Sequence, residues 1–241
     1  MRPELFWCVP AGFVAGLLCV PLWNAVPAKW LCDYGETPGQ KLLGKRVSVK
    51  REGMLLGAVF GAAFFLFAAQ YGVSPVFFLL CAAAVPLALA AFADAKYRII
   101  PNECLPAAIL PALALWLFGL AGKTDYYAFA ASPFLGALAG GGAWLLMGLL
   151  GRALYHRESV GAGDVKLFAA VGFLCGFPGA LYAFFLTILI AGLLFLTLIL
   201  LRRLDPEQEM PMGPYICAAC LLELAFRSRL DELVRQYLSI I

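Results

Sequence analysis

The sequence predicts an all-α, polytopic integral membrane protein, a bundle of about eight transmembrane helices. Three observations support this prediction: the composition, the spacing of the apolar runs, and the distribution of positive charge. Of the 241 residues, 63% are hydrophobic and 14% are charged, whereas a soluble globular domain has about 45–50% apolar and about 25% charged residues. A soluble fold could not bury so much apolar surface, so most of the chain is expected to lie in a lipid bilayer.

Eight apolar runs are predicted as helices, since roughly 20 apolar residues cross a bilayer. They are residues 5–23, 54–71, 75–93, 103–121, 127–150, 164–176, 178–201 and 213–226. The first run is expected to be a permanent helix, because no small-residue cleavage site follows it. The sixth and the eighth are the shortest, and the tail 227–241 is expected to lie along the outer face of the membrane.

Positive charge is concentrated on one side of these predicted helices. Loop 24–53 alone carries six Lys and Arg residues, and an eight-span topology places thirteen of the 18 basic residues on its side. Short loops rich in Lys and Arg stay in the cytoplasm, so both termini are predicted to lie outside. The net charge of +3 is too small to indicate nucleic acid. The expected surroundings are the lipid bilayer, with no nucleic acid partner.

Most of the 15 acidic residues fall in loops or in the tail, but two are predicted to lie at membrane depth. Asp94 stands in "AFADAKYRIIPN" and Asp164 in "GAGDVKLF", both at the cytoplasmic ends of predicted helices. A charge at the edge of a span usually faces a partner or a water-filled cavity. The alternative is a simple interfacial anchor or cap, which the helix dipole would favour for Asp164.

If the two carboxylates meet, they favour acid–base chemistry. Two close carboxylates cannot both ionise cheaply, so the pair shares a proton near neutral pH. The ionised member can then deprotonate a water while the protonated member polarises a peptide carbonyl, which is the chemistry of aspartic proteases and needs no metal. Gly161 and Gly163 leave the backbone before Asp164 without side chains, so an extended substrate could lie close to it.

Three motifs in this order resemble those of the type IV prepilin peptidases, the GxGD-type membrane aspartyl proteases. The first runs from an Asp to Ile-Pro-Asn, the second is Gly-x-Gly-Asp-x-Lys-Leu, and the third is Gly-Pro-aromatic at the start of the last helix. The matching residues are Asp94, Ile100, Pro101 and Asn102; Gly161, Gly163, Asp164, Lys166 and Leu167; and Gly213, Pro214 and Tyr215. The resemblance covers about residues 75–225.

The resemblance implies an aspartic endopeptidase of the cytoplasmic (inner) membrane, with Asp94 and Asp164 as its catalytic pair and no metal or cofactor. Its substrate would be a prepilin or pseudopilin of a type IV pilus or type II secretion system, whose basic leader is cut from an apolar helix at the cytoplasmic face. Residues 1–53 would form the first transmembrane helix and a basic cytoplasmic loop, and residues 54–241 the membrane peptidase domain. The residues expected to support substrate binding are Gly161, Gly163, Lys166, Pro101, Asn102, Gly213 and Pro214.

The N-terminal quarter departs from the family pattern. Longer members carry two Cys-x-x-Cys pairs in the first cytoplasmic loop, in the form that also methylates the new N-terminus with S-adenosylmethionine. Loop 24–53 holds a single cysteine, Cys32, and structural zinc takes four ligands. A bifunctional peptidase and N-methyltransferase, with S-adenosylmethionine as cofactor, stays an open alternative. A small ion- or proton-coupled transporter is the alternative of a different class, although transporters usually place their charges nearer mid-membrane.

The remaining reactive or small residues are interpreted as structural. Seven of the eight cysteines lie in or beside apolar runs, where cysteine behaves as a small hydrophobe. His156, the only histidine, is expected to be solvated. Glycines 140–142 are expected to allow close helix packing. Two roles stay open for Lys166: a membrane anchor, or a group that tunes the aspartates or holds substrate.

Overall fold

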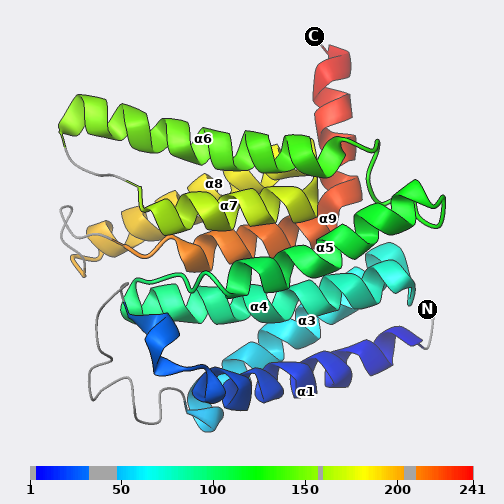
Figure 1. Cartoon of the computed structure of the whole chain (residues 1–241), viewed down its shortest axis with the longest axis horizontal. Helices are drawn as coiled ribbons and strands as arrows, with labels where there is room; N and C mark the ends of the chain where they lie inside the picture. The colour runs from blue at the N-terminus through cyan, green and yellow to red at the C-terminus, as the bar shows by residue number, and fades with distance from the viewer. Residues whose placement is uncertain (1–3, 33–47, 157–159, 204–209, 241) are drawn as a thin grey trace.

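The computed structural model of the chain is built from α-helices (Figure 1). It describes residues 4–32, 48–156, 160–203 and 210–240, and these contain no β-strand. The 3-10 helix η1 (Ala28–Leu31) and the short π-helix η2 (Val49–Gly53) lie between the first two long helices. The predicted all-α bundle is confirmed. Its α-helices are α1 (Glu4–Ala25), α3 (Met54–Tyr71), α4 (Pro75–Tyr97), α5 (Cys104–Leu120), α6 (Ser132–Tyr155), α7 (Ala162–Cys175), α8 (Gly179–Leu200) and α9 (Gly213–Ile240).

Five of the described helices are long and apolar enough to cross a membrane. α5 is apolar but has 17 residues, and α7 has 14, which is short of the roughly 20 that a full span requires. Each of the eight predicted runs corresponds to one of the α-helices. Among the described residues, however, five helices and not eight have the length and composition of a membrane span. The five cover Leu5–Ala25, Lys50–Tyr71, Pro75–Tyr97, Ser132–Leu154 and Gly179–Leu200.

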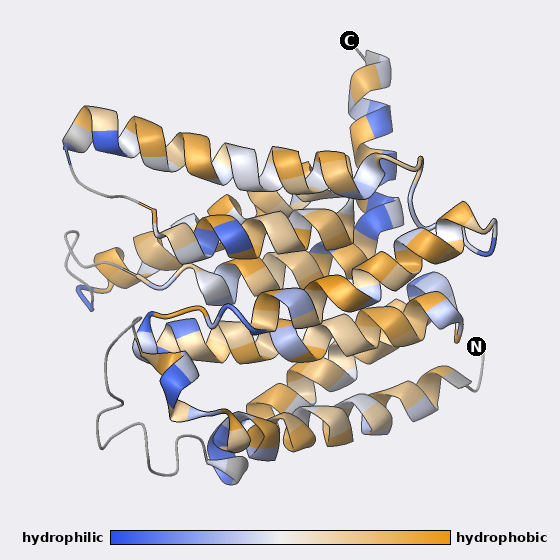
Figure 2. Ribbon diagram, viewed as in Figure 1, coloured by the Kyte–Doolittle hydropathy of each residue, from blue (hydrophilic) through white to orange (hydrophobic). Residues whose placement is uncertain are grey.

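The outer surface of the bundle is apolar. Figure 2 shows apolar residues on the outward faces of the long helices as well as between them. On α6 and α8, for example, Leu138 is 71% exposed and Leu193 is 64% exposed. In water, apolar patches of this kind drive association with other molecules. A bilayer is the solvent in which such a surface is stable.

The start of α6 differs from the prediction. The helix begins at Ser132 rather than at residue 127, because Tyr126 and Tyr127 lie in the loop before it. Their hydroxyl groups donate hydrogen bonds to the backbone carbonyl of Leu174, at 2.9 and 3.2 Å. The two tyrosines therefore tie this loop to the end of α7 instead of extending α6.

The predicted tail is the second half of α9. The helix bends at Phe226, where φ is −121°, and then continues to Ile240. Figure 1 shows this part turned across the direction of the other helices. Leu233, Tyr237 and Leu238 are exposed on it at helical spacing, which is the pattern of an amphipathic helix. Its location on the outer membrane face stays a prediction.

Glycines let α6 and α7 pack closely. A Cβ atom on Gly140 would lie 2.8 Å from the ring of Phe168, and one on Gly141 would lie 3.0 Å from a side chain of α7. The predicted packing role is confirmed for these two glycines. A Cβ on Gly142 would meet nothing within 4 Å, so that position is open. The close contact holds α7 in the middle of the bundle.

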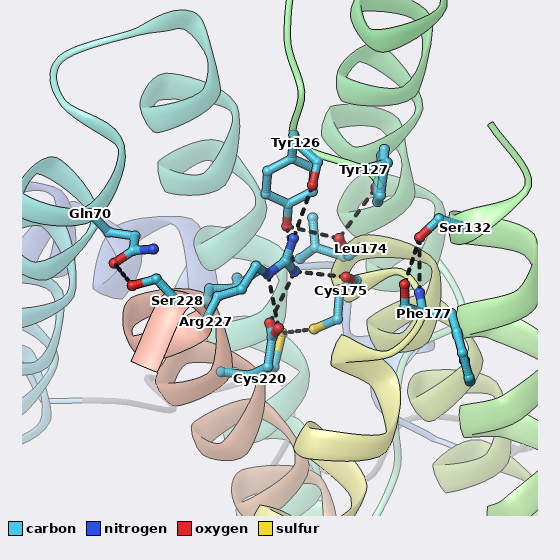
Figure 3. A network of polar contacts seen from close by, with 12 residues as sticks. Gln70, Tyr126, Tyr127, Ser132, Leu174, Cys175, Phe177, Cys220, Arg227 and Ser228 are labelled. Carbon is cyan, nitrogen blue, oxygen red and sulfur yellow. Dashed lines mark hydrogen bonds and ion pairs between the residues drawn. The ribbon is translucent and has the colours of Figure 1, made fainter. Parts of the chain in front are cut away.

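The prediction of two acids at membrane depth missed Glu223, which is buried at the end of the bundle far from Asp94 and Asp164. Glu223 on α9 is 0% exposed, and its Oε1 lies 2.9 Å from Nε of Arg227, one turn later. The same guanidinium donates hydrogen bonds to the Tyr126 hydroxyl at 3.1 Å and to the Cys175 carbonyl at 2.7 Å (Figure 3). This network joins α9, the end of α7 and the loop before α6.

The opposite end of the bundle collects the ends of α4, α6 and α8 and the starts of α7 and α9 (on the left in Figure 1). Positive charge gathers at the helix ends there, as the sequence predicts. Which side of the membrane this end faces remains a prediction from the positive-inside tendency. The described basic residues of these helix ends are Lys96, Arg98, Arg152, Lys166, Arg202 and Arg203.

Candidate active site

Asp94 is held at the start of another helix. It lies in the last turn of α4 and is 6% exposed. Its Oδ2 accepts a hydrogen bond of 2.6 Å from the backbone N–H of Gly213, the first residue of α9. The unpaired N–H groups and the dipole of a helix start favour an anion at this place.

The approach of α9 to Asp94 requires a glycine. A Cβ atom on residue 213 would lie 2.8 Å from both Cβ and Oδ2 of Asp94, which is closer than carbon and oxygen atoms normally approach. Pro214 follows at the first turn of α9, where its missing N–H costs no hydrogen bond. The glycine of the third motif is thus explained by its contact with Asp94 of the first motif.

Asp94 and Asp164 line the same cavity, although 70 residues separate them in the sequence. Asp164 is the third residue of α7 and is half-buried. The cavity has a volume of about 690 Å³, and Arg98 and Gly161 also form part of its wall. The negative charges of the two carboxylates interact across it. The two acids singled out in the sequence are therefore brought into one site.

The Asp164 carboxyl group lies in the first turn of α7, outside the five candidate spans. Burial raises the pKa of Asp164 from its ordinary 3.8 to about 6, and the charge of Asp94 adds to the rise, while a hydrogen bond from the Gly161 backbone lowers it. The group can therefore gain or lose a proton near neutral pH. A carboxyl group with such a pKa beside a second carboxylate is suited to general acid–base catalysis.

The two glycines of the second motif lie in different surroundings. Gly161 lines the cavity, and a Cβ atom there would lie 3.3 Å from Oδ2 of Asp164. Gly163 instead packs beside Ile100, whose side chain would lie 3.5 Å from an added Cβ. A substrate backbone could therefore approach Gly161 closely, as expected. Gly163 is instead packed against Ile100 of the first motif.

Lys166 links the second motif to the first. Its Nζ donates a hydrogen bond of 3.3 Å to Oδ1 of Asn102. The neighbouring Pro101 is buried, and its carbonyl accepts a hydrogen bond of 3.1 Å from the N–H of Cys104 at the start of α5. Lys166, Asn102 and Pro101 are not among the described residues that line the cavity. This contact joins the two motif segments, which is neither of the two roles predicted for Lys166.

Sequence reasoning did not find the apolar wall of the cavity. This wall comes from α6 and α8, and Tyr215 of α9 and residues 210–212 complete it. An apolar residue in an apolar helix carries no signal that separates a cavity wall from a lipid-facing surface. Arg98 also lines the cavity and was not singled out in the sequence. Its spacing could have identified it, because it follows Asp94 by four residues, the distance at which two side chains of a helix are neighbours.

The described residues contain no cluster of three or more His, Cys, Asp or Glu side chains that could hold a metal ion. Seven of the eight cysteines are buried, in line with their interpretation as small hydrophobes. Cys220 of α9 lies with its Sγ 3.8 Å from that of Cys175 at the end of α7. His156 is exposed at the end of α6, as expected, whereas residues 33–47 of the basic loop lie outside the described residues.

Residues 78–196, which contain both aspartates, match the family model of the type IV leader peptidase family. The chain is also similar to curated proteins named prepilin leader peptidase/N-methyltransferase. The one from Bacillus subtilis (strain 168) is 31% identical over 144 residues, which are 56% of this chain and 50% of that protein. No solved structure gave a significant match.

Two further relatives carry the same name. The protein from Xanthomonas campestris pv. campestris is 31% identical over 127 residues, covering 52% of this chain and 42% of that protein. The protein from Aeromonas salmonicida is 31% identical over 156 residues, covering 62% and 48%. The chain thus spans about half the length of the curated relatives that it matches.

Proposed function

Because residues 78–196 belong to the type IV leader peptidase family, we propose that the chain is a membrane aspartic endopeptidase with Asp94 and Asp164 as its catalytic pair. The observation that carries this proposal is the single cavity lined by both carboxylates, whose charges interact. The interaction favours a pair that shares one proton. The ionised member takes a proton from water, and the protonated member polarises the carbonyl of the scissile peptide bond.

The substrate in this proposal is a prepilin or pseudopilin, with a basic leader followed by an apolar helix. The names of the relatives, prepilin leader peptidase/N-methyltransferase, support this substrate class. The positively charged helix ends around the cavity support a cytoplasmic active site, and we place the protein in the inner membrane on that basis. The leader would stay in the cytoplasm while the apolar helix enters the bilayer beside the cavity.

The transporter alternative is not favoured. Asp94 lies in the last turn of α4 and Asp164 in the first turn of α7, whereas transporters bind their ions near the middle of broken helices. The bifunctional alternative is supported by the relatives' names. Against it stands the single cysteine of loop 24–53, so we propose cleavage without methyl transfer.

Cleavage of a prepilin-like peptide by the detergent-purified protein tests the proposal. The wild type is expected to cut one bond, and Asp94→Asn and Asp164→Asn should each abolish cleavage, because neither amide can transfer the proton. Asp125→Asn, at an exposed acid in the loop before α6, is the matched control and should keep full activity. Added EDTA should leave the wild-type rate unchanged. Full activity in either site variant would refute the assignment.

A further inference from the structure

The cavity extends from the two carboxylates along α6 and α8. Its apolar wall includes Trp144 and Met147 of α6 and Ile188, Gly192 and Phe195 of α8. Residues 188 and 195 are seven positions apart, which is about 10 Å along a helix. Both helices run from the far end of the bundle toward the carboxylates, so the wall reaches from the carboxylate end toward the middle of the spans.

Gly192 leaves an opening in this wall. A Cβ atom at this position would meet nothing within 4 Å, although the residue lines the cavity between Ile188 and Phe195. A side chain on residue 192 would therefore occupy free space instead of displacing a neighbour. The preceding Ala191, also on the wall, is small as well.

An apolar occupant fits this wall, and the apolar surface beside it is where such an occupant would enter from the bilayer. The wall itself offers apolar side chains, against which a polar chain would lose its hydration without gaining hydrogen bonds. Beside it on the same helices, Leu146 and Leu189 are exposed on the surface that we place in lipid. About 690 Å³ lies within the range of ligand sites, roughly 300–1,000 Å³. That space holds several side chains but not a whole helix.

We propose that this wall is the binding subsite for the first apolar residues after the scissile bond, and that the open position at Gly192 admits a bulky side chain. The proposal rests on the endopeptidase function proposed above. Because the wall and the carboxylates belong to one cavity, a chain whose bond lies at Asp94 and Asp164 continues directly along α8. The size of the side chain at residue 192 then decides which apolar residues are accepted.

The test compares two matched variants, Gly192→Leu and Gly142→Leu. Both glycines lie in long apolar helices and have no atom within 4 Å of an added Cβ, but only Gly192 lines the cavity. The substrates are prepilin-like peptides in detergent that carry Ala or Phe at each of the first four positions after the scissile bond. The readout is kcat/KM for each peptide.

Gly192→Leu is expected to lower kcat/KM for Phe relative to Ala at one of these positions by about tenfold, as one overpacked side chain does. Gly142→Leu should keep the wild-type ratios. Unchanged ratios in Gly192→Leu would show that the wall faces lipid only and would overturn the subsite. Failure of the wild type to cut any peptide would instead count against the endopeptidase function itself.

If Gly192→Leu instead loses activity equally toward all peptides, the ratios of kcat/KM do not report on the subsite, and a second measurement tests it directly. A peptide with a photoreactive benzophenone side chain at the apolar positions is irradiated with the uncleaving Asp164→Asn protein, and the cross-linked segments are identified by mass spectrometry. Cross-links to residues 144–147 or 188–195 support the subsite. Cross-links confined to other helices would overturn it.

Discussion

Asp164→Asn should stabilise the protein at neutral pH while it abolishes cleavage. The folded protein raises the pKa of Asp164 from 3.8 to about 6, so the folded state holds this proton more tightly than the unfolded state. A group of this kind contributes its full stability below about pH 4, and the contribution is lost as the pH rises through about 6. Asparagine has no proton to lose, so the variant avoids that loss.

The size of this stabilisation follows from the pKa change of Asp164, from 3.8 to about 6. At about 1.4 kcal/mol per pH unit, the variant can gain at most about 3 kcal/mol in the free energy of unfolding. Asp164 is half-buried, so its carboxylate keeps part of its hydration, and we expect roughly half of that limit. The gain of the variant over the wild type should appear between pH 4 and pH 7 and should then stay constant.

Thermal unfolding in detergent, followed by tryptophan fluorescence from pH 4 to pH 8, measures this gain. Asp125→Asn, at an exposed position in the loop before α6, is the control for a surface substitution. Asp94→Asn removes the charge that adds to the pKa rise of Asp164, so in that background the gain should be smaller. An Asp164→Asn protein whose stability relative to wild type is the same at pH 4 and pH 8 would refute the reasoning.

Three further predictions concern packing, the buried ion pair and the missing cysteines. Gly213→Ala would bring a Cβ atom to 2.8 Å from Asp94, and a misplaced catalytic group can cost about 100-fold in rate; cleavage should fall on that order, whereas Gly142→Ala should cut normally. Arg227→Met leaves the fully buried Glu223 unpaired and should lower stability by about 3–5 kcal/mol; the double variant with Glu223→Gln should recover much of the loss in the same unfolding assay. Mature pilin made by co-expression with this enzyme alone should carry an unmethylated N-terminus by mass spectrometry, and a methyl group that depends on S-adenosylmethionine would contradict the proposal of cleavage alone.

The sequence by itself determined that the protein is a helical membrane bundle and where its helices lie. Apolar composition and run length are properties of each segment alone, so all eight runs could be located without knowing how they pack. Helix ends were less accurate where a tertiary contact decided them. Tyr126 and Tyr127 continue an apolar run, but their hydrogen bonds to α7 hold them in a loop.

Asp94 and Asp164 could be found in the sequence because a charge in an apolar segment stands out. Glu223 was missed although Arg227 follows it by four residues, the spacing at which two side chains meet on a helix. Its burial depends on how α9 packs against α7 and the loop before α6, which no local pattern records.

Only the tertiary structure decided what surrounds the two aspartates. The motifs show that Gly213 and Asn102 belong with the site, but not that Gly213 donates a hydrogen bond to Asp94 or that Lys166 holds Asn102. The cavity wall is the clearest case. In a bilayer the core and the surface are both apolar, so Gly142 and Gly192 look alike in the sequence, and the packing of α6 and α8 alone places one of them in the cavity wall.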